Sequence, residues 1–157
     1  MSSATVLFCH GLESGPHGSK FKALEAAGYC VKSPDCRALR TLDQRVQVIA
    51  PLLRELSPLT VGSSFGGVTA VVAAIKTQQR LPGIVLCAPA LNMAPWVEDH
   101  LLAYPITIVH GTMDDVIPIE YSRRYAAKTK AKLIEVEDDH RLHNSMDVIL
   151  DAVSQLK

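Results

Sequence analysis

Long apolar runs and an excess of charge of either sign are both missing from this sequence. No segment approaches the roughly 20 apolar residues that cross a bilayer. The early run at residues 4–9 is too short for that and has no basic residues before it, so we expect a first strand there rather than a signal peptide. Sixteen basic residues balance 16 acidic ones without a block of like charge, which argues against nucleic acid or an anionic membrane surface as a partner.

Metal and nucleotide motifs are also missing. The four cysteines, at positions 9, 30, 36 and 87, show neither Cys-x-x-Cys nor a Cys/His zinc spacing. Reduced thiols in a cytoplasmic protein are the simplest interpretation, although the sequence leaves a disulfide between Cys30 and Cys36 open. Gly-x-Gly-x-x-Gly does not occur, and Ser19 separates Gly18 from Lys20 where a Walker A motif needs Gly-Lys. We therefore expect no nucleotide, metal or organic cofactor.

The length and the apolar content fit one α/β domain over residues 1–157. At 157 residues and 48% hydrophobic content, the chain is long enough to bury a substantial core. Short β-branched or apolar runs alternate with helical patterns, as in a parallel sheet built from βαβ units, and several runs are continuously apolar, as in strands covered on both faces. Strands are expected at residues 5–9, 29–33, 59–62, 83–87, 106–110 and 132–136. The fold class that follows is a three-layer α/β/α sandwich with a mainly parallel sheet of about six strands.

Three helices are indicated by capping residues and apolar spacing. Thr41 and Gln44 have the spacing of a capping box, for a helix that Pro51 is expected to kink or divide. Residues 65–78 have apolar side chains at spacings of three and four, and Ser145 is a candidate N-cap for the last helix. The residues expected to face inward are Leu42, Val46, Ile49, Leu53 and Leu56 in the first helix, Val68, Val71, Val72 and Ile75 in the second, and Met146, Ile149, Val153 and Leu156 in the third.

A Gly-x-Ser-x-Gly motif at residues 62–66 follows one β-prone run and precedes the second of these helices. The string alone arises by chance in many loops, but strand, turn and helix stand here in the order that a nucleophile elbow requires. The serine of such an elbow occupies a strained turn, and the two glycines are needed because backbone and neighbouring strands come too close for a Cβ. The sequence therefore predicts Ser64 as an exposed nucleophile.

The pair His10-Gly11 directly follows the first expected strand. Open parallel sheets place their ligands at the carboxyl ends of strands, and a His-Gly pair there commonly begins a loop that gives one backbone N–H to an oxyanion hole. We assign the two donors of this hole to the N–H groups of Leu12 and of Phe65, the residue after the serine. The alternative is that His10 and Gly11 only turn the chain.

Aspartates and histidines follow the last two expected strands. Asp114 and Asp115 come after the fifth strand, where a carboxylate can accept the Nδ1–H of a histidine and stabilise the imidazolium formed during proton transfer. Paired carboxylates also suggest metal ligation, but adjacent side chains usually point apart and no third ligand is evident. His140 and His143 follow the sixth strand, and His140 is the better general base because it lies in a polar turn just beyond the strand.

Over essentially its whole length, the sequence resembles a small α/β-hydrolase of the compact bacterial serine esterase type. The motifs that carry the resemblance are the elbow at residues 62–66, Gly111-x-x-Asp114-x-x-Ile117-Pro118, and Asp-His-Arg-Leu at residues 139–142. They occur in the order serine, aspartate, histidine that is typical of this family. The resemblance implies that Asp114, not Asp115, is the acid.

The resemblance also implies a minimal form of the fold without a substantial lid. Larger members begin with an antiparallel hairpin and carry a helical lid, whereas this chain keeps only residues 89–103 at the lid position. An open site favours short acyl groups, since each buried CH₂ contributes about 0.8 kcal/mol. The expected activity is hydrolysis of small carboxylic esters or thioesters through an acyl-enzyme. An acyltransferase with the same triad and a non-catalytic binding protein on the same scaffold stay as alternatives, and the sequence does not predict the oligomeric state.

Overall fold

The computed structural model, which describes residues 4–156, is built around one six-stranded sheet in which every strand pair is parallel. The strands are β1 (Thr5–Cys9), β2 (Cys30–Lys32), β3 (Leu59–Ser63), β4 (Ile84–Cys87), β5 (Ile106–Gly111) and β6 (Lys132–Val136). The strand order is β2-β1-β3-β4-β5-β6. The six expected strands are confirmed, and their ends differ from the predicted ones by at most one residue.

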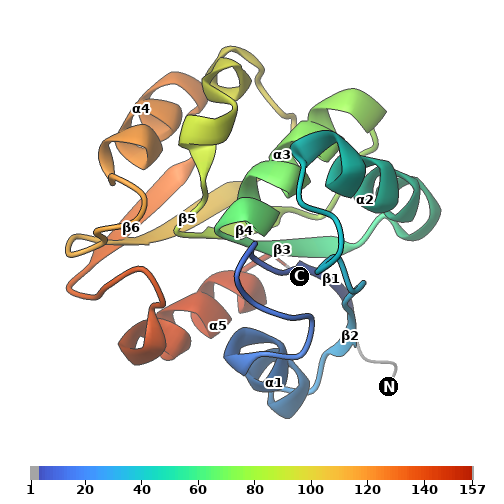
Figure 1. Ribbon diagram of the computed structural model, residues 1–157, viewed down its shortest axis with the longest axis horizontal. Coiled ribbons are helices and arrows are strands. Elements are labelled where there is room, and N and C mark those ends of the chain that lie inside the picture. The colour runs from blue at the N-terminus through green and yellow to red at the C-terminus, as the bar shows by residue number, and fades with distance from the viewer. Residues whose placement is uncertain (1–3, 157) are drawn as a thin grey trace.

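Helices cover both faces of the sheet and complete the predicted three layers (Figure 1). The α-helices are α1 (Ser19–Ala26), α2 (Leu42–Leu56), α3 (Phe65–Thr77), α4 (Glu120–Thr129) and α5 (Met146–Ser154). The 3₁₀ helices are η1 (Leu91–Met93), η2 (Pro95–Asp99) and η3 (His143–Ser145). In Figure 1, α2, α3 and α4 lie on one side of the sheet, and α1 and α5 lie on the other.

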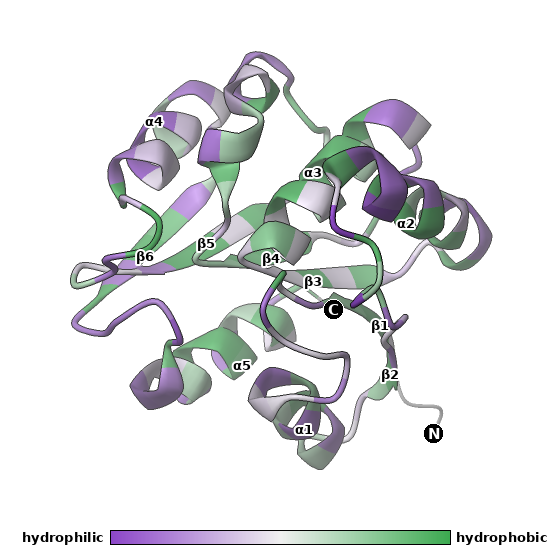
Figure 2. Cartoon of the chain, viewed as in Figure 1, coloured by the Kyte–Doolittle hydropathy of each residue, from purple (hydrophilic) through white to green (hydrophobic). Residues whose placement is uncertain are grey.

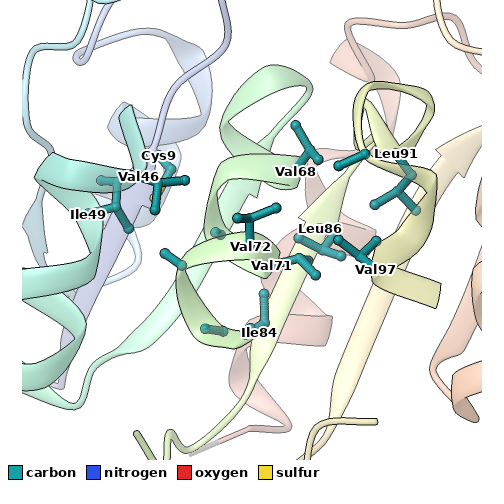
Figure 3. Close-up of a cluster of buried hydrophobic side chains, with 14 of the residues drawn as sticks. Cys9, Val46, Ile49, Val68, Val71, Val72, Ile84, Leu86, Leu91 and Val97 are labelled. Atoms are coloured by element: carbon teal, nitrogen blue, oxygen red, sulfur yellow. The ribbon is translucent and has the colours of Figure 1, made fainter. Parts of the chain in front are cut away.

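Two hydrophobic clusters, one on each face of the sheet, hold these layers together. The first joins α2 and α3 to the sheet through residues such as Ile49, Val71 and Leu86, and part of it is drawn in Figure 3. The second joins α1 and α5 to the other face through residues such as Leu24 and Val153. In Figure 2, the central strands β3 and β4 are largely hydrophobic, whereas hydrophilic segments are frequent in α2 and α4. Burial on both faces explains why the central strands are continuously apolar.

Helix α2 begins as predicted but is not divided by its proline. The hydroxyl of Thr41 accepts a hydrogen bond from the N–H of Gln44, and the side chain of Gln44 accepts one from the N–H of Thr41. Of the two expectations for Pro51, a kink or a division of the helix, division is wrong, because the helix runs unbroken from Leu42 to Leu56. Pro51 is exposed, so the carbonyl that loses its N–H partner lies on the solvent side of the helix, where water can satisfy it.

The last helix begins differently from the prediction. Ser145 stands at the expected N-cap position, but its side chain caps no backbone N–H group. Its hydroxyl instead donates a hydrogen bond of 2.8 Å to Oδ2 of the buried carboxylate of Asp138. A hydrogen bond with a charged carboxylate is stronger than one with a neutral backbone N–H group, which explains this choice of partner.

The disulfide that the sequence left open is not present. All four cysteines are free, and Cys30 is exposed whereas Cys36 is buried. No helix within residues 4–156 is long and apolar enough to cross a membrane.

The strand order directs attention to the carboxyl ends of β1 and β3. The chain passes from β1 outward to β2 and then returns to the other side of β1 to form β3, so these two neighbours mark the topological switch point of the sheet. The His10-Gly11 loop follows β1, and Ser64 follows β3. Residues 88–105, between β4 and β5, contain only the short helices η1 and η2, so no lid covers this edge.

Candidate active site

Ser64 occupies a strained turn between β3 and α3. Its backbone dihedral angles are φ 55° and ψ −115°, a region that L-residues rarely adopt. A Cβ on Gly62 would lie 2.7 Å from the carbonyl oxygen of Gly66, and a Cβ on Gly66 would lie 2.0 Å from the carbonyl oxygen of Cys9. Neither position admits a side chain, so the steric reason given for the glycines of the elbow is confirmed.

The two predicted oxyanion donors follow the adjacent strands β1 and β3, with Leu12 in the loop after β1 and Phe65 at the start of α3. Phe65 is the first residue of α3, so its N–H has no acceptor inside the helix. The N–H of Leu12 makes no hydrogen bond to another group within residues 4–156. The amino end of α3 carries partial positive charge, which favours an anion beside Ser64.

Asp114 lies in the turn after β5, with a side chain that is fully buried. Its Oδ1 atom accepts hydrogen bonds of 2.8 Å from the N–H groups of Val116 and Ile117, and its Oδ2 atom lies 2.8 Å from Nδ1 of His140. Burial raises the pKa of this carboxyl, but the hydrogen bonds from His140, Ile117 and Val116 together outweigh it and lower the pKa below 3.8. The neighbouring Asp115 is exposed and takes no part in these contacts.

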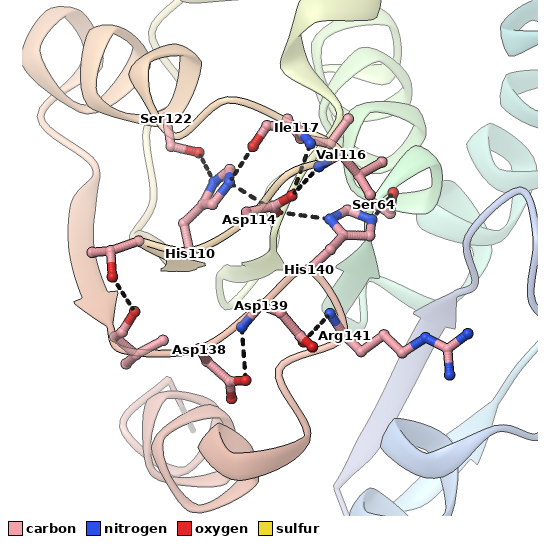
Figure 4. A network of polar contacts seen from close by, with 12 residues as sticks. Ser64, His110, Asp114, Val116, Ile117, Ser122, Asp138, Asp139, His140 and Arg141 are labelled. Carbon is pink, nitrogen blue, oxygen red and sulfur yellow. Dashed lines mark hydrogen bonds and ion pairs between the residues drawn. The ribbon is translucent and has the colours of Figure 1, made fainter.

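His140 joins the aspartate to the serine (Figure 4). Its Nε2 atom lies 2.9 Å from Oγ of Ser64, while Nδ1 contacts Asp114. The side chain is 19% exposed, so the ring is held by partners on both sides and still reaches the surface. His143 is exposed on η3, outside this group. The structure thus brings together Ser64, Asp114 and His140, three residues that the sequence places far apart.

A second histidine, His110, contacts the same carboxylate and had no role in the sequence analysis. It is fully buried at the end of β5, with Nε2 3.1 Å from Oδ2 of Asp114 and 3.0 Å from the carbonyl oxygen of Ile117. A carbonyl can only accept, so Nε2 carries the proton and Nδ1 accepts from the hydroxyl of Ser122 at 2.7 Å. Burial lowers the pKa of His110 more than the contacts with Ile117 and Asp114 raise it. The one signal in the sequence is its place directly before Gly111, which begins the motif of residues 111–118 that carries Asp114 (the acid loop).

Asp138 anchors the turn that carries His140. This buried carboxylate accepts hydrogen bonds from the N–H groups of Asp139 and Asn144 as well as from the Ser145 hydroxyl. The same turn packs closely against the acid loop. A Cβ on Gly111 would lie only 2.2 Å from the carbonyl oxygen of Asp138. The backbone of the two loops is therefore in direct contact beside Asp114 and His140.

Residues 51–155 match the Phospholipase/Carboxylesterase family. This stretch is about two thirds of the chain and contains Ser64, Asp114 and His140. The chain belongs to this family. No curated protein has a matching sequence.

Solved structures place this family member in the α/β-hydrolase superfamily. A Xanthomonas campestris pv. campestris protein assigned to that superfamily is 28% identical, with a TM-score of 0.84 over 99% of this chain and 98% of its own. The structure of Est1E from Butyrivibrio proteoclasticus is 17% identical, with a TM-score of 0.79 over 98% of this chain and 86% of its own. A monoacylglycerol lipase from Paleococcus ferrophilus is also 17% identical, with a TM-score of 0.76 over 98% of this chain and 95% of its own. The protein is a hydrolase of the α/β superfamily and is esterase- or lipase-like.

Two surface cavities of this hydrolase lie away from Ser64, at the opposite end of the sheet. Their volumes are about 550 and 560 Å³, and both are bordered by residues 101–104. One reaches the start of β5 and the end of α4, and the other reaches the end of α3. Neither is lined by Ser64, Asp114 or His140, and their walls lack a nucleophile paired with a base, so we do not assign the chemistry to them. Within residues 4–156, no three His, Cys, Asp or Glu side chains converge in a way that could hold a metal ion.

Proposed function

We propose that this protein is a serine hydrolase that cleaves small carboxylic esters or thioesters through an acyl-enzyme intermediate. The observation that carries the proposal is the unbroken chain of hydrogen bonds from Ser64 through His140 to Asp114, with contacts of 2.9 and 2.8 Å. A serine hydroxyl is a weak nucleophile at its free pKa, and an adjacent oriented base is what activates it.

In the proposed reaction, Oγ of Ser64 attacks the carbonyl carbon while Nε2 of His140 takes the hydroxyl proton. Asp114 accepts the Nδ1–H of His140 throughout and stabilises the imidazolium that forms. The N–H groups of Leu12 and Phe65 bind the oxyanion of the tetrahedral intermediate. The intermediate collapses as His140 protonates the leaving alcohol or thiol. Water then attacks the acyl-serine by the same steps in reverse and releases the acid.

We infer that the substrate is a small molecule with a short acyl group. Ser64 stands at an edge of the sheet that no lid covers, and neither cavity described above adjoins it. Val116, whose N–H binds Asp114, is 58% exposed and offers an apolar surface beside the triad. An open surface contributes less than the roughly 0.8 kcal/mol per CH₂ of an enclosed pocket, so longer chains gain little. Acetyl and butyryl esters and thioesters are therefore the first substrates to compare.

We further propose a cytoplasmic location. The four free cysteines, three of them buried, are consistent with a reducing compartment. The balanced charge of the chain gives no reason to expect a nucleic acid partner.

The test is the intact mass of the protein after exposure to a fluorophosphonate. An activated serine displaces fluoride and gains one phosphonyl group. We expect one label per chain in the wild type and none in Ser64→Ala or His140→Ala, each checked for folding by circular dichroism. Labelling that persists in Ser64→Ala would place the reactive group elsewhere and contradict the assignment.

The same preparation separates the two alternative functions. A folded wild type that takes up no label would favour a binding protein on a hydrolase scaffold. Labelling with slow hydrolysis, but fast turnover when an alcohol or thiol acceptor is added, would favour an acyltransferase. Steady hydrolysis of short esters in water alone is the result that we expect.

A further inference from the structure

Arg45 is a buried cation without an acidic partner. It lies in the first half of α2 and is 1% exposed. No carboxylate within residues 4–156 forms an ion pair with it, although a buried charge is costly unless it is paired and hydrogen-bonded. The burial of this unpaired charge therefore needs an explanation in the contacts of its guanidinium.

The guanidinium of Arg45 binds the loop that follows β1. Its Nη1 atom donates to the carbonyl oxygens of His10 and Gly11, at 2.7 and 3.2 Å, and its Nε atom donates to the carbonyl of Leu39 at 2.8 Å. The Nη2 atom is buried and has no hydrogen-bond partner. All of the acceptors are neutral, so the positive charge of Arg45 stays uncompensated beside the His10-Gly11 loop.

The same loop is fixed from a second side by the ring of His10. Its Nε2 atom accepts the N–H of Cys36 at 2.9 Å, so Nδ1 carries the proton and donates to the carbonyl oxygen of Gly11 at 2.7 Å. Arg45 and His10 thus both hold the Gly11 carbonyl. A trans peptide is planar, with its C=O and N–H pointing in opposite directions. Fixing the carbonyl of Gly11 therefore fixes the direction of the N–H of Leu12.

Arg45 also contacts the residue that carries the other proposed donor. Its guanidinium carbon lies 5.1 Å from the centroid of the Phe65 ring, within the range of a cation–π contact. The Phe65 ring is itself buried. The side chain of Arg45 therefore contacts both the loop of Leu12, which follows β1, and the side chain of Phe65, which follows β3.

We propose that Arg45 is the positioning residue of the oxyanion hole, which orients the Leu12 N–H through the Gly11 carbonyl and adds an unpaired positive charge behind the two donor segments. This inference rests on the proposed hydrolase function. Electrostatic stabilisation of an oxyanion is strongest when donors and charges are held in place before the reaction. A buried arginine in contact with both donor segments provides such a fixed arrangement.

The test compares wild type with Arg45→Met, Arg45→Lys and Arg54→Met. Arg54 lies on the same helix but is exposed, so its variant is the matched control. For each protein we would measure thermal stability, kcat and KM for a short ester, and the inhibition constant of a trifluoromethyl ketone. That ketone forms an anionic adduct with the serine, which mimics the transition state.

For Arg45→Met we expect kcat to fall about 10- to 100-fold, somewhat less than the loss from removing a direct oxyanion donor. KM should stay within threefold, and the inhibition constant of the ketone should rise by the same factor as kcat/KM falls. A purely structural role would not produce that proportionality. Arg45→Lys keeps the charge but cannot reach all three carbonyls, so an intermediate loss is expected, while Arg54→Met should stay within twofold of wild type.

Several outcomes would overturn this role for Arg45. A folded Arg45→Met or Arg45→Lys with wild-type kcat would do so, as would a loss of kcat without weaker binding of the ketone. If Arg45→Met does not fold, Arg45→Lys decides, and failure of both variants to fold would assign Arg45 to stability alone. A wild type that neither labels nor turns over would instead refute the hydrolase proposal, which separates the two failures.

Discussion

Nε2 of His110 lies 3.1 Å from Oδ2 of Asp114, the same oxygen that lies 2.8 Å from Nδ1 of His140. One carboxylate oxygen therefore faces two imidazole rings. The His110 ring is held in a fixed tautomer by Ile117 and Ser122, and its burial favours the neutral form. In the proposed mechanism, the buried ring helps to orient the carboxylate and the partly exposed ring of His140 exchanges protons.

The first prediction concerns stability against pH. Burial lowers the folded-state pKa of His110 and of His10 below their ordinary value of 6.5. Between the folded-state and the unfolded-state pKa of each histidine, the unfolded chain binds more protons than the folded protein. The free energy of unfolding should therefore reach its highest value above about pH 6.5 and fall as the pH drops below it. Urea unfolding at pH 8 to 5 would measure this loss, which is at most about 1.4 kcal/mol per group and pH unit. His110→Gln should have the shallower dependence, and a wild-type stability that is flat over this range would contradict the prediction.

The second prediction separates the two neighbouring aspartates. Asp114→Asn should lower kcat by about 10³- to 10⁴-fold, because an amide no longer stabilises the Nδ1–H tautomer and the imidazolium of His140. Asp115→Asn changes an exposed side chain outside the network and should stay within about twofold of wild type. Steady-state kinetics on one short ester decides the matter. The opposite order of losses would show that Asp115 is the acid.

The third prediction concerns the anchor of the histidine turn. Asp138→Ala leaves the N–H groups of Asp139 and Asn144 and the hydroxyl of Ser145 without their acceptor, so we expect a loss of about 2–4 kcal/mol. For a chain of this size, the melting temperature should fall by about 2–4 °C for each kcal/mol. The control is Asp139→Ala, since that side chain is exposed and accepts one bond from the N–H of Arg141. Equal melting temperatures for both variants would refute the anchoring role of Asp138.

The fourth prediction tests the steric demand of the elbow. Gly66→Ala would place a Cβ 2.0 Å from the carbonyl oxygen of Cys9, so β1 and α3 cannot keep their positions. We expect little folded protein or a loss of several kcal/mol, read by circular dichroism and urea unfolding. In Gly15→Ala the nearest atom is a side-chain carbon of Arg37 at 3.6 Å, an ordinary contact, and the change should stay within about 0.5 kcal/mol. Normal stability of Gly66→Ala would mean that the elbow is looser than described.

Much of the fold and of the candidate site could be predicted because the signals are local. Each strand is a short apolar run, and each of Ser64, Asp114 and His140 follows the end of such a run. Parallel strands bring their carboxyl ends to one edge of the sheet, so the strand pattern alone indicates that these residues gather there. Sequence motifs then distinguish Asp114 from Asp115 and His140 from His143.

The parts that could not be predicted depend on contacts between distant segments. Arg45 has the spacing of a core residue, four positions before Ile49, but a charged side chain is ordinarily exposed. Its partners His10 and Gly11 lie more than 30 residues earlier. Ser145 has the local pattern of a helix cap, yet the Asp138 carboxylate takes its hydroxyl instead. At Ser145, local propensity gives way because a charged buried partner offers a stronger bond.

The absence of a side chain at Gly111 has a consequence for protein engineering. The acid loop and the histidine turn fit together through main-chain atoms, with Gly111 against the carbonyl of Asp138 and the N–H of Met113 donating to that same carbonyl at 3.0 Å. Two segments that fit in this way behave as one module. A loop graft from a relative that replaces only one of them would lose the fit, whereas transplanting both together would preserve the spacing between Asp114 and His140.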